Sequence, residues 1–289
     1  MALVYFDKFM ERTGVRNFGD DINPVLMIKF FNKSILSSDE VALFGIGTIL
    51  NDKNIKNNNH YARKVIFSSG VGYGKLETNL DNTWDIACVR GPGSARALGI
   101  GAEKAIADGA ILLSEVYKKP VKQRSRALFI PHVSSHLSTG RLLATIAEKL
   151  DMDYLSPSCN TDEFIQTVAS APFIVTEAMH GAILADTMRV PWVPVSFHEY
   201  HEFKWRDWMD SVQLNGGAVH PLSPKCWDRD GSQPMSSLKV WYKSGKEHFL
   251  KLKIRKVIAS QEPLLSQLDI LESRKHALLE VVNDINRKY

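Results

Sequence analysis

The central stretch of the chain reads Phe173-Ile-Val-Thr-Glu-Ala-Met-His-Gly-Ala-Ile-Leu-Ala-Asp-Thr-Met-Arg-Val-Pro-Trp-Val-Pro-Val195. Its apolar start predicts a buried strand over 173–175, then a helix over about 177–188 and a second strand over 190–195. Thr176 is expected to cap this helix, and Glu177 suits the positive end of the helix dipole. The stretch therefore predicts a strand–helix–strand unit of a parallel sheet.

The polar residues of this unit lie where the first strand passes into the helix. Ligands of open parallel sheets bind at this carboxyl edge. Glu177 and His180 are three residues apart, so we expect them to share a face of the helix. The pattern predicts that His180 donates or accepts a proton and that Glu177 assists it. The alternative is a buried histidine that bonds to the backbone.

Strands that end in glycine or polar residues alternate with helices in both halves of the chain. This alternation predicts an α/β fold with two Rossmann-like domains, each built on a parallel sheet. The polar, basic segment 118–126 is the best candidate for a linker. We expect an N-terminal α/β domain over 1–120, a C-terminal α/β domain over 121–237, and a basic and helical segment over 238–289 that packs back on the N-terminal domain. The main predicted strands are 41–48, 64–74, 86–90 and 127–130, and the main predicted helices are 139–150 and 162–169.

The composition is that of an ordinary globular protein, with 289 residues, 44% hydrophobic and 24% charged. A net charge of +4 fits an anionic substrate or a membrane surface and is too small to indicate nucleic acid binding. Cys88, Cys159 and Cys226 are isolated, which argues against a disulfide framework or a zinc site. The start of the chain lacks the pattern of a signal peptide and no run has about 20 apolar residues, so we expect a cytoplasmic location.

Glycines follow several predicted strands without forming a nucleotide-binding fingerprint. Gly45-Ile-Gly47 and Gly70-Val-Gly-Tyr-Gly74 both lack the spacing of that motif, and tight turns explain them equally well. Arg90-Gly-Pro-Gly-Ser94 is more informative, because a guanidinium and a fresh helix N-terminus together favour a phosphate or carboxylate. A structural ion pair between Arg90 and Asp108 is the alternative.

Three further segments carry polar residues with more than one interpretation. His132 and His136 have a spacing that suits a metal, although a polar loop is favoured because no third ligand is evident. Asp151-Met-Asp153 has the spacing of the DxD of metal-dependent sugar transferases, although a solvated turn is favoured because the segment follows a predicted helix. Lys204-Trp-Arg-Asp-Trp208 combines indoles that stack on sugars with cations that pair with anions. The alternative is an amphipathic helix that docks through its tryptophans.

Taken in order, these pieces resemble the polysaccharide pyruvyl transferase family over about residues 17–211. The resemblance implies an enzyme that transfers pyruvate from phosphoenolpyruvate to a sugar as a ketal, without a cofactor or metal. It also implies a similarity to the B-type glycosyltransferase fold, with two domains facing across a cleft. The matching stretches are Asn17-Phe-Gly-Asp-Asp21, Gly45-Ile-Gly-Thr48, Gly70-Val-Gly-Tyr-Gly74, Val89-Arg-Gly-Pro-Gly-Ser94, Asp108-Gly-Ala110, Glu177-Ala-Met-His-Gly181 and Lys204-Trp-Arg-Asp-Trp208.

By this resemblance His180 matches the active-site histidine of the family, and Arg90 matches an anion-binding arginine. We expect His180 and Glu177 to be catalytic. The chain departs from the family at Ala178, where many members carry arginine, and we expect Lys204 or Arg206 to supply that charge, with Arg189 a weaker candidate. The expected substrate-binding residues are Arg90, Ser94, Asp20, Gly72, His132, Lys204, Trp205 and Trp208.

Two other classes of function remain open at this point. One is a nucleotide-sugar glycosyltransferase of similar fold, and the other is a carbohydrate- or anion-binding protein without catalysis. The partners expected are phosphoenolpyruvate and an oligosaccharide or lipid-linked glycan acceptor. The basic segment 239–256 is either a solvated face or a contact with the inner face of an anionic membrane.

Overall fold

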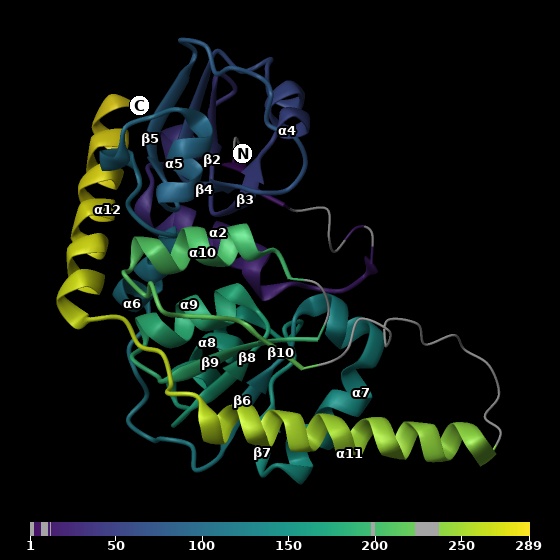
Figure 1. Ribbon diagram of the computed structural model, residues 1–289. Coiled ribbons are helices and arrows are strands. Elements are labelled where there is room, and N and C mark those ends of the chain that lie inside the picture. Colours follow the sequence, from purple (N-terminus) through teal and green to yellow (C-terminus); the bar gives the residue numbers. More distant parts are fainter. Residues whose placement is uncertain (1–2, 7–10, 12, 198–199, 223–236) are drawn as a thin grey trace. The chain divides into compact units, whose positions relative to one another are not determined.

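The computed structural model describes residues 3–6, 11, 13–197, 200–222 and 237–289 (Figure 1). Its contacts divide the chain into two compact units. The first unit comprises Met1–Lys118, His201–Gly216 and Ser266–Tyr289, and the second comprises Lys119–Tyr200 and Gly217–Leu265. Each contains one parallel sheet with helices, so the predicted α/β class with two parallel sheets is confirmed. The similarity to the B-type glycosyltransferase fold stays a prediction.

The sheet of the first unit is built around β4, and every described pairing in it is parallel. β4 pairs along one side with β2 and then β3, and along the other side with β5, while β1 pairs with β2. The five strands are β1 (Leu3–Val4), β2 (Val41–Phe44), β3 (Gly47–Leu50), β4 (Arg63–Val71) and β5 (Trp84–Val89).

The prediction of one strand over 41–48 is wrong, because the segment is split between β2 and β3. Asn23 explains the break. Its side chain is fully buried, and it accepts a hydrogen bond from Ile46 N at 2.7 Å and donates one to Ile46 O at 3.0 Å. The backbone of Ile46 is therefore bonded to a helix instead of a neighbouring strand. Gly47 follows with a φ of 132°, a conformation that favours glycine.

Helices α2 and α12 are the longest helices of the first unit. α2 begins after Asn17, so Asp20 and Asp21 lie in its first turn and do not cap it. Both still face the positive end of the helix dipole. The helices of this unit are α2 (Phe18–Phe30), α3 (Lys33–Leu36), α4 (Asp52–Asn57), α5 (Pro92–Leu98), η1 (Ala102–Lys104), η2 (Gly109–Leu112), α6 (Leu113–Val116), α10 (Glu202–Ser211) and α12 (Leu268–Lys288).

The division into units differs from the expected boundaries at two helices. α10 was placed with residues 121–237, yet it belongs to the first unit because it packs on α5 and β4. The terminal segment 238–289 is divided, because α11 (Ser237–Ser260) joins the second unit whereas α12 lies along β5 and η2 in the first (Figure 1). At its end, Lys288 Nζ donates to Asp85 at 2.6 Å and ties the C-terminus to β5.

The sheet of the second unit has the strand order β10-β9-β8-β6-β7, with every described pairing parallel. The chain runs outward from β6 to β7 and then returns past β6 to β8, so the order reverses between β6 and β8. Such a reversal opens a crevice at the carboxyl ends of the strands, where ligands of doubly wound folds bind. The strands are β6 (Ala127–Ile130), β7 (Met152–Tyr154), β8 (Ile174–Thr176), β9 (Trp192–Ser196) and β10 (His220–Pro221).

Alternate residues of these strands face two different layers. Phe129, Val175 and Val193 pack in one cluster with apolar residues of α7 and α11, including Leu250 and Ile254. Trp192, at an even-numbered position, faces the other layer, where its indole N–H donates to Asp186 of α9 at 3.3 Å. The helices are α7 (Val133–Lys149), α8 (Thr161–Ala169), α9 (Met179–Thr187) and α11, and no helix in the described part of the chain is long and apolar enough to cross a membrane.

Two local predictions in this unit hold only in part. A helix is found over most of the predicted residues 139–150, but α7 also includes an earlier helical segment that begins at Val133, and Thr139 marks the kink between the two segments with a non-helical φ of −139°. Residues 152–154 form β7 where a solvated turn was expected. The charge of Asp153 is compensated by Arg124, with an N–O distance of 2.7 Å, and by Arg126 at 3.1 Å. The strand β7 depends on contacts that are remote in the sequence, since it pairs with β6, whereas His132 caps the start of α7 through its neighbour Ser134.

Candidate functional site

Glu177 joins the carboxyl ends of three neighbouring strands in the second unit. Its backbone N–H donates to Ile130 O at the end of β6, at 2.8 Å. Its carboxylate accepts hydrogen bonds from His132 N at 3.0 Å and from Phe197 N at 2.9 Å. The residue is only 7% exposed. Glu177 therefore holds the loops after β6, β8 and β9 together at the crevice where the strand order reverses.

The predicted start of α9 is wrong by two residues. Thr176 Oγ1 accepts from Ala178 N at 3.0 Å and donates to Ala178 O at 3.1 Å, which closes a turn instead of capping a helix. Ala178 is the N-cap, and it provides no side-chain bond. Glu177 thus lies outside the helix and does not share a helical face with His180. His180 is the second residue of α9 and is half-buried.

His132 and His136, the two histidines of the predicted polar loop, both form hydrogen bonds with residues of the second unit. His132 caps α7, because its Nδ1 accepts from Ser134 N at 3.3 Å. His136 lies 2.8 Å from Tyr154 Oη through Nδ1 and 3.2 Å from Ser156 Oγ through Nε2. Burial lowers the pKa of His136, and burial followed by the charge of Glu177 raises the pKa of Tyr154. Within the described residues no group of three or more His, Cys, Asp or Glu side chains could hold a metal ion.

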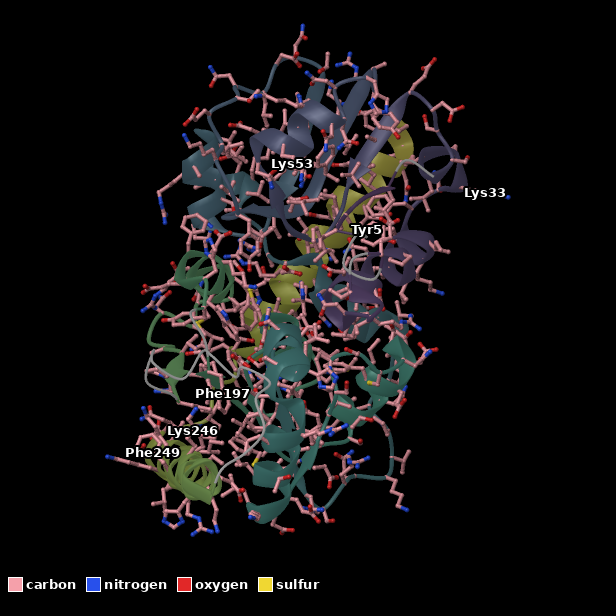
Figure 2. All side chains as sticks on the ribbon, turned by 90° about the vertical axis from the view of Figure 1, so that its right-hand side faces the viewer. Tyr5, Lys33, Lys53, Phe197, Lys246 and Phe249 are labelled. Atoms are coloured by element: carbon pink, nitrogen blue, oxygen red, sulfur yellow. The ribbon has the colours of Figure 1, made fainter. Side chains whose placement is uncertain are left out.

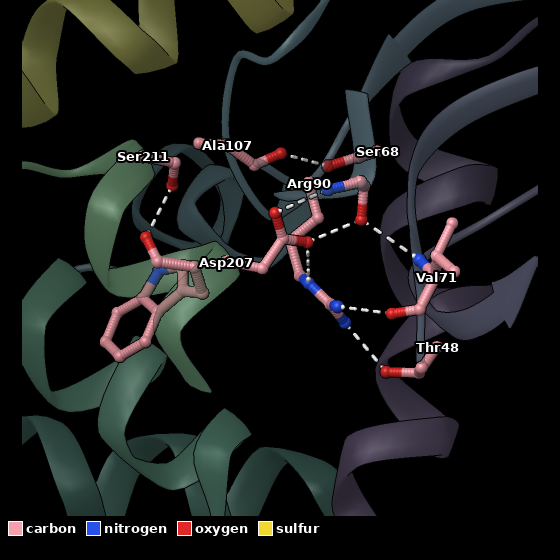
Figure 3. A network of polar contacts seen from close by, with 9 residues as sticks. Thr48, Ser68, Val71, Arg90, Ala107, Asp207 and Ser211 are labelled. Carbon is pink, nitrogen blue, oxygen red and sulfur yellow. Dashed lines mark hydrogen bonds and ion pairs between the residues drawn. The ribbon is translucent and has the colours of Figure 1, made fainter. Parts of the chain in front are cut away.

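In the first unit Arg90 is fully buried and its guanidinium is bonded on every nitrogen (Figure 3). Nε donates to Asp207 at 3.0 Å, Nη1 to Thr48 Oγ1 at 2.7 Å and Nη2 to Val71 O at 3.1 Å. Arg90 therefore offers no exposed surface to an anion in this conformation. The structure favours the alternative of a structural ion pair, although the partner is Asp207 and not Asp108.

Ser94 completes this network. Its Oγ donates to Asp207 at 2.5 Å and accepts from Val71 N at 3.0 Å, while its backbone N–H donates to Asp207 at 2.9 Å. Gly91 allows the close approach, because a Cβ there would lie 1.8 Å from Asp207 O. Arg90 and Ser94 thus fix α10 against the end of the first sheet.

The two tryptophans of α10 are buried. Trp205 is 3% exposed and Trp208 is 0% exposed, and their rings meet edge to face with centroids 6.5 Å apart. Neither ring is open to a sugar, contrary to the prediction that they stack on an acceptor. The alternative, a helix that docks through its tryptophans, is the arrangement found. Their burial leaves the remaining faces of α10 to Lys204 and Arg206.

Lys204 and Gly72 lie together at the carboxyl end of β4. Lys204 Nζ is 3.2 Å from Tyr73 Oη, and a Cβ on Gly72 would meet His201 Cε1 at 3.2 Å. Asp20 is placed on α2, where its carboxylate accepts from Asn17 Nδ2 at 2.6 Å. The predicted substrate-binding set thus divides, with His132 in the second unit and its other members in the first.

Sequence reasoning missed four residues that contact the predicted ones. Asp207 was quoted within the Lys204–Trp208 motif, yet its partner is remote in the sequence. Thr48 and Tyr73 lie within the glycine-containing stretches, whose pattern indicates backbone turns and not a role for side chains. His201 stands directly before α10 and carried no motif. The four residues that the sequence did not single out are Thr48, Tyr73, His201 and Asp207.

Fold and site together define a two-unit α/β protein with polar residues gathered at the carboxyl ends of parallel strands. Residues 16–199 match the family described as polysaccharide pyruvyl transferase. The chain belongs to this family, which confirms the resemblance seen in the sequence. It is also 34% identical over 199 residues to the succinoglycan biosynthesis protein ExoV of Rhizobium meliloti (strain 1021). That alignment spans 68% of this chain and 61% of the relative.

Replacing Glu177 tests its role at the strand ends. Glu177→Ala leaves the buried N–H of Phe197 and the part-buried N–H of His132 without this acceptor. At about 1–3 kcal/mol each, the variant should lose about 2–6 kcal/mol of unfolding free energy. Glu177→Gln keeps one acceptor oxygen and should lose less. Urea unfolding measures both. Glu148→Ala, at an exposed position of α7, should change stability by less than about 0.5 kcal/mol. Equal losses for Ala and Gln would contradict the role of the two bonds.

Asp108 makes the first unit sensitive to pH. Burial raises the pKa of this carboxyl to about 6, although Ala110 N–H and the charge of Arg90 lower it. The folded state therefore holds the proton more tightly than the unfolded state, so stability falls as pH rises between about 4 and about 6. Relative to wild type, Asp108→Asn should gain about 3 kcal/mol between about pH 4 and about pH 7. Urea unfolding across this range checks it, and a pH-independent difference would contradict it.

Proposed function

We propose that this protein transfers pyruvate from phosphoenolpyruvate to a sugar of an exopolysaccharide or of its lipid-linked precursor, forming a ketal and releasing phosphate. The observation that carries the proposal is membership of the polysaccharide pyruvyl transferase family over residues 16–199. The relative is named for the biosynthesis of succinoglycan, and this supports a glycan acceptor. No cofactor is needed, because phosphoenolpyruvate is the donor substrate.

The chemistry sets requirements for the site. A proton must reach C3 of phosphoenolpyruvate, which makes C2 an oxocarbenium-like centre. One sugar hydroxyl attacks C2, a second closes the ketal, and the C2–O bond to phosphate breaks. Of the two hydroxyl protons, one balances the proton added to C3 and the other leaves on phosphate. One acid–base group and at least one cation for the anionic donor are therefore sufficient.

His180 is the proposed acid–base group. It lies on the first turn of α9, beside the loop that Glu177 holds. As a protonated imidazolium it gives a proton to C3, and the neutral imidazole then takes the proton of the attacking hydroxyl. Glu177 acts by positioning, because its carboxylate bonds fix the residues that precede α9. The proposal thus assigns proton transfer to His180 and orientation to Glu177.

Lys204 is the proposed cation for the donor. Arg90 is fully buried in its pair with Asp207, whereas Lys204 is half-buried and reaches Tyr73 at the end of β4. This exposure matters, since an anionic substrate must reach the charge without breaking a buried ion pair. Arg90 then serves the reaction indirectly, by holding the helix that carries Lys204.

The proposed activity is tested by phosphate release from phosphoenolpyruvate with glycan acceptors. His180→Ala should lower turnover by about 10²–10⁴-fold because the proton donor is lost. Its donor affinity, measured by calorimetry, should stay near wild type. His276→Ala, at an exposed position of α12, is the matched control. Stabilisation by a nucleotide sugar alone would instead favour a glycosyltransferase, and binding of phosphoenolpyruvate or glycan without phosphate release would favour a non-catalytic binding protein.

Helix α11 supports an association with an anionic membrane surface, which would place the activity at its inner face. Leu250, Ile254 and Val257 bury one side of the helix. Phe249, which Figure 2 labels, is 43% exposed. Leu252 is 49% exposed. The flanking cations, with Lys253 Nζ 5.8 Å from the Phe249 ring, are Lys246, Lys251, Lys253, Arg255 and Lys256.

This combination suits an interface of apolar tails and anionic headgroups. Exposed Phe and Leu side chains can enter the boundary between headgroups and acyl chains, while lysines and arginines bind the headgroups. Each basic residue near an anionic surface contributes about 1 kcal/mol at moderate ionic strength. The acidic residue of the same segment, Glu247, is already paired with Lys149.

Vesicle sedimentation of the full chain tests the membrane contact. Vesicles of phosphatidylcholine with phosphatidylserine should carry the protein down, and phosphatidylcholine alone should not. Arg255→Glu with Lys256→Glu should weaken this binding by about tenfold or more, since two attractive charges become repulsive. Lys53→Glu with Lys56→Glu, the same charge change on α4, should bind as wild type. Equal binding to both vesicles, or equal effects of both double variants, would contradict the proposal.

A further inference from the structure

A compact group of residues lies at the carboxyl end of β4 in the first unit. Gly72 and Tyr73 follow the strand, while His201 and Lys204 belong to the start of α10. The rings of Tyr73 and His201 meet edge to face with centroids 4.8 Å apart. Lys204 Nζ lies 3.2 Å from Tyr73 Oη and 5.5 Å from the centre of its ring. Tyr73 thus stands between an imidazole and an ammonium group.

The internal packing of the unit does not explain the hydrogen bonding of His201. Its Nδ1 is buried and has no hydrogen-bond partner in the part of the chain that the structure describes. Such an atom is costly, and most buried polar atoms in proteins are bonded. The ring meets Tyr73 edge to face and lies close to the backbone of Gly72. A fixed, unsatisfied ring nitrogen of this kind is suited to a ligand.

Gly72 determines how closely these groups approach. Its φ of 148° lies in the region that favours glycine, and a Cβ would meet Thr48 Cγ2 at 3.1 Å and His201 Cε1 at 3.2 Å. Without a side chain at 72, His201 lies directly against the backbone at the end of β4. Thr48 is in turn held by Arg90 Nη1 at 2.7 Å. The group therefore has a rigid base.

The charges around the group favour an anion. Lys204 is the cation nearest the Tyr73 hydroxyl, and the adjacent Asp207 is neutralised by Arg90. Glu202, the acidic residue of the first turn of α10, is exposed to solvent and its charge is screened there. Tyr73 is 47% exposed, so a ligand can reach the hydroxyl and the ammonium group from solvent.

We propose that Gly72, Tyr73, His201 and Lys204 form an anion-binding cradle for the phosphate or carboxylate group of the donor. Lys204 supplies the charge, while Tyr73 Oη and the Nδ1–H tautomer of His201 donate hydrogen bonds. The identity of the donor rests on the proposed function, whereas the capacity to bind a phosphate or carboxylate anion does not.

Calorimetry with the full chain tests the cradle, using phosphoenolpyruvate, inorganic phosphate and pyruvate as separate probes. Lys204→Met and His201→Leu should each weaken phosphoenolpyruvate binding by about tenfold or more, the effect of losing one charge-assisted hydrogen bond. His201→Gln should recover part of the affinity. Lys53→Met, which removes an exposed lysine of α4 in the same unit (Figure 2), should bind as wild type. Phosphate and pyruvate show which end of the donor is held.

The possible outcomes separate the cradle from the proposed function. If wild type binds phosphoenolpyruvate through these residues but releases no phosphate with glycan acceptors, the cradle stands and the proposed activity fails. If wild type turns over while His201→Leu and Lys204→Met keep the wild-type KM for the donor, the activity stands and the cradle is wrong. Absence of phosphoenolpyruvate binding to wild type overturns the cradle. Thermal unfolding of each variant checks that it is folded.

Discussion

Arg90 and Asp207 form a fully buried ion pair between residues 117 positions apart in the sequence. Removing one partner of such a pair leaves an uncompensated buried charge, which commonly costs about 3–5 kcal/mol. The pair brings α10 back to the sheet of the first unit after the chain has built most of the second. The positions of His201 and Lys204 depend on it, since Lys204 precedes Asp207 on α10 and His201 stands directly before that helix. The positions of the proposed anion-binding groups thus depend on a buried ion pair that is not itself part of the cradle.

Glu177 has a related structural role at the sheet of the second unit, where it accepts hydrogen bonds from backbone groups beyond the strand ends. Backbone N–H groups beyond the ends of parallel strands have no ladder partner, and burial makes each of them costly. One carboxylate accepts from two of these groups, on either side of the central strand β8. The residue that looked from its spacing like half of a catalytic pair is therefore first a structural one. His180 benefits from this, because the backbone that leads into α9 is fixed from both sides.

Local patterns predicted much of the fold. The strand over 127–130 was predicted at its observed bounds because an apolar run ends there at Pro131, and α8 was predicted to within one residue. The errors come from contacts remote in the sequence. Asn23 divides the predicted strand at Ile46, and the Arg90–Asp207 pair moves α10 into the other unit. For the candidate site, the sequence pointed to residues by their chemical groups. Their burial in the structure then distinguished a structural role from a ligand-binding role.

Burial also changes which residues are suited to bind a charged substrate. A guanidinium that is bonded on every nitrogen inside the protein would have to lose Asp207, Thr48 or Val71 before it could bind an anion. By comparison, the half-buried ammonium group of Lys204, which is bonded to the Tyr73 hydroxyl, can bind an anion without breaking a buried ion pair with Asp207. Tryptophans inside the core likewise cannot stack on a sugar. The same motif, Lys204-Trp-Arg-Asp-Trp208, therefore divides its work, with Trp205, Asp207 and Trp208 anchoring the helix so that Lys204 can face solvent.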